Sequence, residues 1–420
     1  MTTKNRAPLI GIWRDGELMG VQGQDPDEWK LISTAPRTRT AFFRPVGRVG
    51  GASVGAGTGV GRICDVAFAI PGRPIAVQVV FANMNTAATL TLNAAKIASP
   101  SALMTTQGAA LFAAGKALTF GGSASVVLPV AVQGSSRVLP GLVVADPVGI
   151  VPVARTDEVG APGVYRIRAH VPDNSVLLNA GPGTDGAAYN ANSVNGGAKL
   201  AAYSFASAAA GIDTNDSSLL DFGGPVAVYG LIVTYAHDVD DMVVGGDSLD
   251  QGVNTPGSYC GWPVQLQTAL LATGRPMNVF NVSDAGMRLV DSLRQLRFAC
   301  ALRKPRFAAL HLWSNNIEAF TTAQRDQEHA ELHFTLDWLV QRGITPVVLS
   351  TGPFATEATK SLNARLADLS DYVVTVDLAS LYDSTGALKA EYNDGLADSV
   401  HGNLSYHTGV MRLVREALGR

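Results

Sequence analysis

The sequence predicts an N-terminal all-β domain, sandwich or jelly-roll-like, over residues 1–235, and then an α/β domain with a parallel sheet flanked by helices over residues 236–420. Three observations lead to this prediction. The chain has 420 residues, and a single domain usually holds roughly 100–200. Short apolar runs between turn signals fill the first half, whereas strand-like and helix-like segments alternate in the second. Hydrophobic residues make up 47% and charged residues 16%, which suffices for a core in each half.

The first half has the pattern of an antiparallel β protein. Gly and Pro separate short runs rich in Val, Leu and Thr. In one run, alternation predicts that Arg166 and Arg168 lie on the opposite face from Tyr165 and Ile167. Residues 180–224 are rich in Gly, Ala, Asn and Ser, which predicts an extended loop region. The predicted strands are 76–81, 88–92, 125–130, 141–145, 163–171 and 226–235.

The second half alternates strands and helices from residue 241 onward. In 287–302 the apolar side chains fall largely on one side of a helix, and a helix over 321–342 is closed by Gly343. This alternation predicts a parallel sheet with helices on both faces and a ligand site beyond the carboxyl ends of its strands. The predicted strands are 241–245, 277–282, 307–312, 345–350 and 372–376, and the predicted helices are 287–302, 321–342, 357–369 and 404–418.

Charge and hydropathy exclude several classes of partner. The net charge is −3, so the basic surface that a nucleic-acid ligand requires is not expected. We expect no membrane span, because no stretch of about 18 uninterrupted apolar residues occurs. Arg14 and Asp15 interrupt the first apolar run before it reaches the length of a signal-peptide core. A cytoplasmic or virion-associated location is therefore the expectation.

The cysteine and histidine spacings do not predict a metal site. Cys64, Cys260 and Cys300 lie far apart, so we expect either three buried thiols or a bridge between the last two. His329 and His333 have a spacing that can hold a metal on a helix, but the charged residues around them favour a solvated helix face. His311 lies inside an apolar strand, and we expect it to be a core residue with satisfied ring nitrogens. No metal and no cofactor are expected.

Two segments at opposite ends of the second half carry the residue types of nucleophilic catalysis. Ser248 follows the apolar run 242–246, whose two glycines would let the chain turn sharply. Asp398 stands three residues before His401, which lets a carboxylate orient an imidazole that takes a proton from serine. Each segment has a plainer interpretation as well: a strand-to-loop turn with a serine cap, and a surface turn with a capping aspartate.

Two middle segments carry candidate donors for a developing oxyanion. Residues 281–286 follow one predicted strand, and Gly286 could present its backbone amide. Residues 313–316 follow the next strand, and Asn315 could present its side-chain amide. Either segment alone would be interpreted as an ordinary loop.

Taken in order, the four segments resemble the SGNH (GDSL) hydrolase family over about residues 241–420. The matches are Gly246-Asp247-Ser248-Leu249, Asn281 to Gly286, Trp313-Ser314-Asn315-Asn316 and Asp398-Ser399-Val400-His401. Two segments depart from the family pattern. Trp313 stands where the family usually has Gly and Asn316 where it has Asp, while Ser283 and Ala285 replace the usual Gly and Ser of the second segment. The departures put the shape of the loop around Asn315 in doubt.

The resemblance implies a flavodoxin-like fold and a role for each residue. Ser248 would attack an ester carbonyl, His401 would act as general base and then acid, and Asp398 would orient His401. The backbone amides of Ser248 and Gly286 and the side chain of Asn315 would form the oxyanion hole. We also expect Trp313 and Asp247 to contact the substrate.

The substrate and partners remain open between several alternatives. A β-rich domain beside such a hydrolase favours a short-chain, acetyl ester of a carbohydrate as substrate, by fold-level association. The alternatives are a lipase or thioesterase acting on acyl chains, and a bacteriophage or prophage tail component whose hydrolase domain mainly binds. The few charges between residues 85 and 150 indicate a surface that either another subunit or the hydrolase domain covers, and in the first case we expect a homo-oligomer through the β-rich half.

Overall fold

The computed structural model describes most of the second half and separate segments of the first. The described residues are 10–14, 17–22, 39–43, 51–53, 59–70, 74–98, 112–133, 138–150, 163–179, 201–206, 208–213, 225–235, 239–252, 255, 261–272, 277–302, 304–315, 317–350, 364, 372–393 and 401–420.

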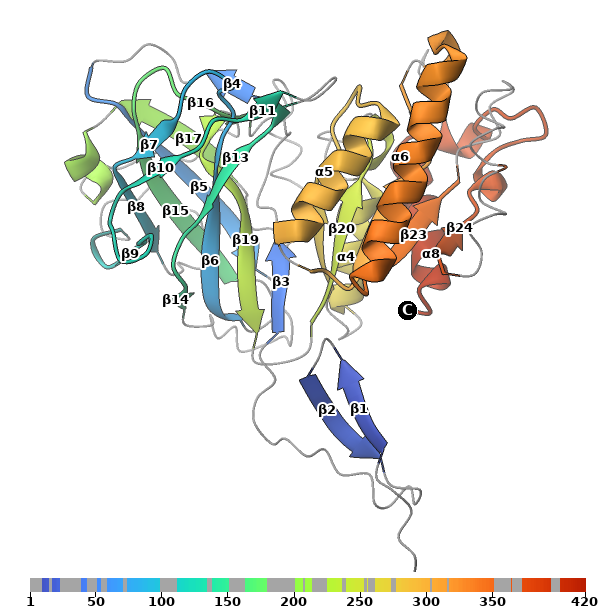
Figure 1. Ribbon diagram of the computed structural model, residues 1–420, viewed down its shortest axis with the longest axis horizontal. Coiled ribbons are helices and arrows are strands. Elements are labelled where there is room, and N and C mark those ends of the chain that lie inside the picture. Colours follow the sequence, from blue (N-terminus) through green and yellow to red (C-terminus); the bar gives the residue numbers. More distant parts are fainter. Residues whose placement is uncertain are drawn as a thin grey trace, which may run out of the picture.

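Two antiparallel sheets dominate the described part of the first half (Figure 1). One has the order β17 (Ala201–Ala206), β5 (Arg62–Ile70), β15 (Gly163–Val171), β8 (Ala94–Ala98) and β9 (Lys116–Ala117). The other has the order β13 (Gly141–Val144), β6 (Pro74–Asn83), β19 (Val228–Tyr235) and β3 (Arg39–Phe43), with β14 (Val148–Gly149) also on β6. Smaller groups pair β1 (Ile10–Arg14) with β2 (Glu17–Gln22), β7 (Leu90–Leu92) with β10 (Val126–Leu128), β11 (Val132–Gln133) with β12 (Val138–Leu139), and β16 (Val176–Asn179) with β18 (Pro225–Val226) and β4 (Gly51–Ser53).

These strands confirm the predicted runs and correct one detail. Strand β17 lies within residues 180–224, which we had expected to be loop. Both faces of β15 are buried, with Tyr165 and Ile167 on one and Arg166 and Arg168 on the other. The two arginines can be buried because Asp65 on β5 binds both guanidinium groups. The sandwich or jelly-roll form and the boundary at residue 235 stay predictions.

The second half contains the predicted parallel sheet. Among the described residues its order is β21 (Met277–Asn281), β20 (Asp240–Gly245), β22 (Phe307–His311), β23 (Thr345–Leu349) and β24 (Val374–Val376). Side chains alternate between two cores: Val243 packs with α5 (Leu289–Leu302) and α6 (Thr322–Gln341), while Met242 and Val244 pack with α4 (Trp262–Ala272) and α8 (Leu404–Ala417). Helices therefore cover both faces, as expected for buried parallel strands.

The predicted helices are confirmed at 287–302, 321–342 and 404–418. Thr321 and Gln324 form a capping box at the start of α6, and Gly343 follows its end with a φ of +65°. The predicted helix 357–369 falls outside the described residues except for residue 364. Helix α4 was not predicted.

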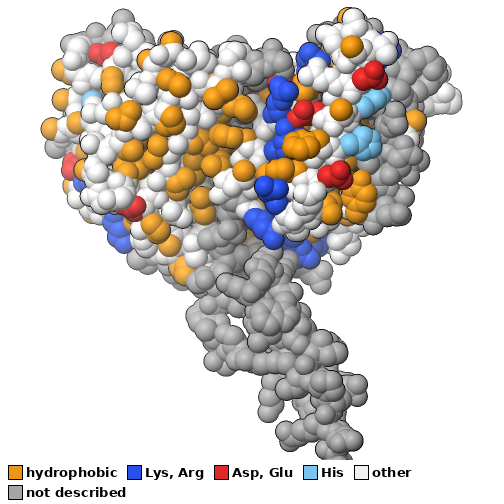
Figure 2. All heavy atoms as spheres, in the orientation of Figure 1, with side chains coloured by type: hydrophobic (Ala, Val, Ile, Leu, Met, Phe, Trp, Pro, Cys, Tyr) orange, Lys and Arg blue, Asp and Glu red, His pale blue; other side chains and the backbone are white. Residues whose placement is uncertain are grey.

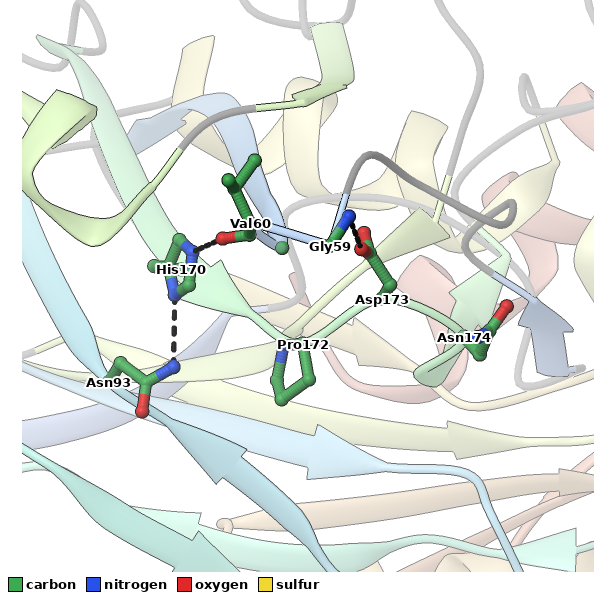
Figure 3. Close-up of a pocket in the computed structure, with 8 residues that line it drawn as sticks. Gly59, Val60, Asn93, His170, Pro172, Asp173 and Asn174 are labelled. Atoms are coloured by element: carbon green, nitrogen blue, oxygen red, sulfur yellow. Dashed lines mark hydrogen bonds between the residues drawn. The ribbon is translucent and has the colours of Figure 1, made fainter.

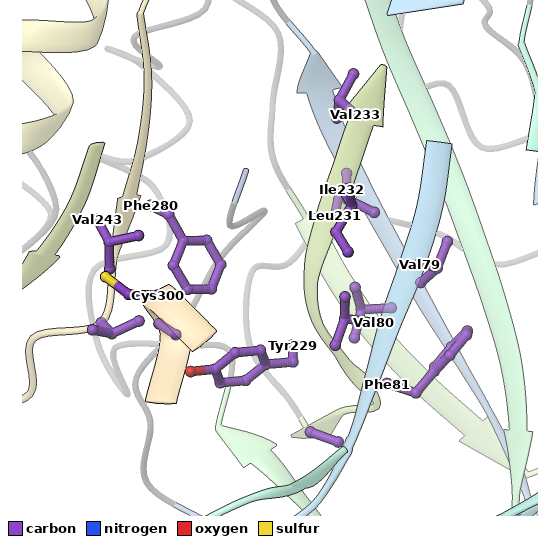
Figure 4. Close-up of a cluster of buried hydrophobic side chains, with 14 of the residues drawn as sticks. Val79, Val80, Phe81, Tyr229, Leu231, Ile232, Val233, Val243, Phe280 and Cys300 are labelled. Carbon is purple, nitrogen blue, oxygen red and sulfur yellow. The ribbon is translucent and has the colours of Figure 1, made fainter. Parts of the chain in front are cut away.

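One hydrophobic core joins the two halves. The centroid of the Tyr229 ring on β19 lies 5.5 Å from the centroid of the Phe280 ring on β21 (Figure 4). It lies 6.5 Å from the centroid of the Phe298 ring on α5. Asn278 on β21 donates a hydrogen bond of 2.8 Å to the Tyr235 hydroxyl of β19. The last long strand of the first half is thus packed directly against the α/β sheet.

Other expectations of the sequence can be placed on the structure. Cys64 and Cys300 are free and buried, so Cys300 does not bridge to Cys260, which lies outside the described residues. None of the described helices is long and apolar enough to cross a membrane. Hydrophobic side chains gather on the face of the β-rich half shown in Figure 2, and Val127 and Val132 are 57% and 61% exposed.

Candidate active site

The candidate nucleophile lies on a single helical turn at the carboxyl end of β20. The turn is α3 (Ser248–Gln251), and Asp247 caps it by accepting a hydrogen bond of 2.9 Å from the Leu249 amide. Ser248 is the first residue of the turn and is 6% exposed. A helix this short is not stable by itself, so the orientation of Ser248 depends on the elements packed around α3.

Close packing and not a positive φ favours glycine at the two positions before Asp247, most strongly at Gly246. Neither Gly245 nor Gly246 has φ in the left-handed region. A Cβ at Gly245 would lie 3.1 Å from Leu296 of α5, and a Cβ at Gly246 would lie 1.9 Å from the Asp250 carboxylate. The sequence had indicated a sharp turn, and the structure replaces that reason with two close approaches.

His401 and Ser248 come together across 153 residues of chain. The Nε2 atom of His401 lies 2.7 Å from the Ser248 Oγ. His401 stands two residues before Asn403, whose side chain caps α8 by accepting from the Tyr406 amide. A serine hydroxyl that donates to an imidazole nitrogen is the arrangement that general-base activation requires. Asp398, the predicted third member, lies outside the described residues.

Two backbone amides beside Ser248 are available to an oxyanion. The Asp284 amide donates to the Gly246 carbonyl and the Ala285 amide donates to Gln251 Oε1, so the turn that contains Gly286 lies against α3. Gly286 has a φ of +79°, which requires glycine. Within the described part of the chain, neither the Ser248 amide nor the Gly286 amide has a hydrogen-bond acceptor.

The Asn315 side chain is already engaged. Its Nδ2 donates to Asp247 Oδ2 at 2.6 Å and to the Met287 carbonyl at 2.8 Å. Since an amide nitrogen carries two protons, Asn315 reaches an oxyanion only by sharing or exchanging one of them. Trp313 is half-buried beside it, and Asn316 lies outside the described residues.

Asp247 is an acceptor in this site and not a free surface carboxylate. Burial, followed by the nearby Asp250 carboxylate, raises the pKa of Asp247 to about 7, against the lowering effect of its hydrogen bonds. Both of its oxygens accept N–H groups, from Leu249 and from Asn315. Its side chain is thus turned toward Asn315 and 2% exposed, which differs from the predicted contact with substrate.

Sequence reasoning missed Asp250 and misjudged His311. Asp250 is fully buried and accepts a hydrogen bond of 2.7 Å from Trp262 Nε1. His311 is buried as predicted, but its ring is not satisfied: neither nitrogen has a hydrogen-bond partner among the described residues. The position of Asp250, two residues after the nucleophile, was the signal available in the sequence.

A separate cavity of about 530 Å³ in the β-rich half offers no comparable chemistry (Figure 3). His170 lines this cavity. Its Nε2 atom lies 3.0 Å from the Val60 carbonyl oxygen, and its Nδ1 atom lies 3.1 Å from Asn93 Nδ2. Asp173 accepts a hydrogen bond from the Gly59 amide. No serine, threonine or cysteine lines this cavity in the described structure, so it lacks a nucleophile.

The described residues do not bring together three side chains that could ligate a metal. His329 and His333 lie on α6, where they are half-buried at the surface. The described residues around Ser248 offer acid–base and hydrogen-bonding groups.

Comparison with known proteins gives a likeness at the level of solved structures. No protein-family model and no curated protein sequence matches the chain. A lipolytic protein of the G-D-S-L family from Desulfitobacterium hafniense is similar over 42% of this chain and 98% of its own, with 12% identity and a TM-score of 0.36.

Two further solved structures are similar to a comparable extent. The esterase EstA of Pseudoalteromonas covers 43% of this chain and 97% of its own, with 14% identity and a TM-score of 0.35. An acetyl-xylooligosaccharide esterase from Geobacillus is similar over 43% of this chain and 94% of its own, with 15% identity and a TM-score of 0.36. At these scores the likeness does not by itself indicate an activity for this chain.

Proposed function

We propose that residues 236–420 form a serine esterase of the SGNH (GDSL) type, a carboxylic ester hydrolase that uses Ser248 as nucleophile. The observation that carries the proposal is the 2.7 Å contact between Ser248 Oγ and His401 Nε2 at the carboxyl end of a parallel sheet. The backbone amides of Ser248 and Gly286, which have no acceptor among the described residues, supply the second requirement for acyl transfer.

The reaction follows from these positions. His401 takes the Ser248 proton as the hydroxyl attacks the ester carbonyl, and the developing oxyanion accepts hydrogen bonds from the Ser248 and Gly286 amides. His401 then gives the proton to the leaving alcohol, and a water molecule hydrolyses the acyl-enzyme by the same two steps. Asp398 is the proposed residue that holds the His401 ring in the tautomer with Nε2 free.

Asn315 is proposed as the third oxyanion donor, held in place by Asp247. Its present contacts with Asp247 and Met287 fix the amide plane beside the nucleophile loop. As negative charge develops on the substrate oxygen, one Asn315 N–H group exchanges its present acceptor for the oxyanion and donates a hydrogen bond to it. Loss of one such donor typically lowers the rate by about 10²–10³-fold.

For the substrate we propose a short-chain acetyl ester on a carbohydrate. Trp313, which is half-buried and precedes Asn315 by two residues, supports this class, because aromatic side chains commonly line the binding sites of small ligands. In this proposal the β-rich half, as an all-β domain over residues 1–235, shapes the approach of the glycan. Its exposed Val127 and Val132 support a homo-oligomer contact there.

The esterase proposal is tested with p-nitrophenyl esters of increasing acyl length. The wild type should hydrolyse the acetate, Ser248→Ala should abolish turnover, and His401→Ala should lower it by about 10³-fold or more. A rate that falls beyond short acyl groups identifies a deacetylase, whereas a rate that rises identifies a lipase or thioesterase. Full activity in Ser248→Ala would contradict the proposal.

A second candidate is a binding module, as in a phage or prophage tail component. One observation favours it: both Asn315 amide protons are occupied, which leaves the oxyanion site with two donors. Inertness of the wild type toward activated esters and fluorophosphonate probes, together with retained binding to an acetylated glycan, would identify this alternative.

A further inference from the structure

A buried group of ionisable side chains lies around the turn that carries the nucleophile, and the chemistry above uses neither Asp250 nor His311. Its members are Asp250 on α3 and His311 at the end of β22, with Asp247 beside them. Asp250 is 0% exposed and His311 is 2% exposed. Asp250 follows Ser248 by two residues and His311 precedes Asn315 by four, so the pair connects the turn that carries the nucleophile to the strand that leads to Asn315.

Asp250 is confined on three sides. Its Oδ1 accepts from Trp262 Nε1 of α4, and its backbone carbonyl accepts a hydrogen bond of 2.9 Å from Asn281 Nδ2 at the end of β21. Its Oδ2 lies so close to the Gly246 backbone that a Cβ there would approach it to 1.9 Å. The Nδ1 atom of His311 lies 3.6 Å from Oδ2. A shift of a few tenths of an ångström turns that contact into a hydrogen bond.

The surroundings of His311 favour a charged ring. Two carboxylates face it, Asp250 and Asp247 on the α3 side, and the backbone of Ser350 lies on the β23 side. Burial alone would lower the pKa of His311, but these neighbours more than offset it and raise the pKa above its usual value. Tyr406 of α8 faces the same carboxylates and stays neutral, because burial raises its pKa well above the usual range.

We infer that His311 and Asp250 form a buried ion pair that positions Ser248, by tying the single turn of α3 to the strand end from which Asn315 projects. The inference rests on the proposed esterase function. Neither residue touches the reacting atoms, so both are positioning residues. Their effect is expected on the rate of the chemical step, because misplacement of a nucleophile by about 1 Å can cost about 10²-fold.

The test measures the rate constant for phosphonylation of Ser248 by a fluorophosphonate, together with kcat and KM for p-nitrophenyl acetate. Asp250→Asn and His311→Gln should each lower the phosphonylation rate and kcat by about tenfold or more, with KM within about twofold. The double variant should be no slower than the slower single variant, because the two residues act as a unit.

Two control variants match these substitutions. Asp241→Asn changes a buried carboxylate at the opposite end of β20, where Oδ1 accepts from the Arg306 amide. His170→Gln changes a buried histidine of the β-rich half. Both should keep the wild-type phosphonylation rate per folded molecule, with the folded fraction taken from urea unfolding. Wild-type rates in Asp250→Asn and His311→Gln would overturn the positioning role.

Nitrogen-15 spectra of histidine-labelled protein separate this inference from the esterase proposal. The His311 ring should be an imidazolium at pH 7 in the wild type and a neutral imidazole in Asp250→Asn. A neutral ring in the wild type would overturn the ion pair whatever the activity. A wild type that shows the imidazolium but does not react with ester or fluorophosphonate would instead overturn the esterase proposal, and the positioning role with it.

Discussion

The two halves of the molecule each bury a cluster of charged side chains, and the clusters differ in how completely they are paired. In the β-rich half, Asp65 binds Arg166 and Arg168, Arg168 also donates to the Ile212 carbonyl, and the Phe112 ring lies over both guanidinium groups. In the α/β half, Asp250 and His311 lie 3.6 Å apart, and neither Asp250 Oδ2 nor the His311 ring has a hydrogen bond within the described chain.

The buried histidines show the same contrast. Both ring nitrogens of His170 lie within hydrogen-bond distance of a polar atom, from Val60 and Asn93, and Gly61 permits the close approach of the chain, since a Cβ there would lie 2.7 Å from the ring. His311 is equally buried and lacks both bonds. Paired buried charges hold a fold together, whereas incompletely paired ones beside a nucleophile indicate a site where stability is sacrificed for reactivity.

The largest effect expected from this contrast is on stability in the β-rich half. Asp65→Asn should lower the free energy of unfolding by about 3–5 kcal/mol, because it leaves two buried guanidinium groups without their anion. The same substitution at Asp250 should cost far less stability. Urea unfolding of the two variants compares them directly, and kcat per folded molecule should be unchanged in Asp65→Asn. Equal losses of stability would erase the distinction between the clusters.

A smaller effect is expected on activity from the glycine beneath the nucleophile. Gly246→Ala forces the Asp250 carboxylate away from its place, because the added Cβ would approach Oδ2 to 1.9 Å. We expect kcat to fall by about 10²-fold through displacement of α3. Gly61→Ala, which crowds His170 in the other half, should reduce stability and leave kcat per folded molecule unchanged. Steady-state kinetics with active-site titration measures kcat per folded molecule in both variants. A fully active Gly246→Ala would contradict the packing argument.

The smallest effect concerns Asp247 and pH. Asp247→Asn removes one of the two oxygens that accept N–H groups, so Asn315 loses its acceptor and kcat should fall by about tenfold. The acid limb of kcat/KM should also become less steep, because the Asp247 carboxylate, whose pKa burial raises to about 7, no longer titrates there. A raised kcat would show instead that Asp247 holds Asn315 away from the oxyanion.

The same variant should alter the dependence of stability on pH. Burial, then Asp250, raises the pKa of Asp247 from 3.8 to about 7, so the folded chain binds a proton that the unfolded chain releases. The stability from this group is present at low pH and is lost as pH rises from about 4 to 7. Urea unfolding across that range should show a smaller decline in Asp247→Asn than in the wild type.

The strands of the first half and the alternation of the second were predictable because their periodicity is local. Helix α4 was not, since its side chains Trp262, Leu266 and Leu270 are buried and Gln267 is used to accept from the Val279 amide. A helix enclosed between a sheet and another helix does not show a clear polar face. Strand β17 has Tyr203 and Phe205 at alternate positions, but it lies in a stretch rich in Gly, Ala, Asn and Ser, a composition that favours a loop.

The sequence by itself determined the parallel sheet, the order of the four segments at its strand ends, and the candidates Ser248 and His401. These follow from periodicity and from the rule that parallel strands end on one edge of a sheet. Tertiary structure alone decided that Gly246 makes room for a carboxylate, that Asn315 is bound to Asp247, and that the His311 ring lies 3.6 Å from the Asp250 carboxylate. Those facts depend on distances between residues far apart in the chain, and no local pattern encodes such distances.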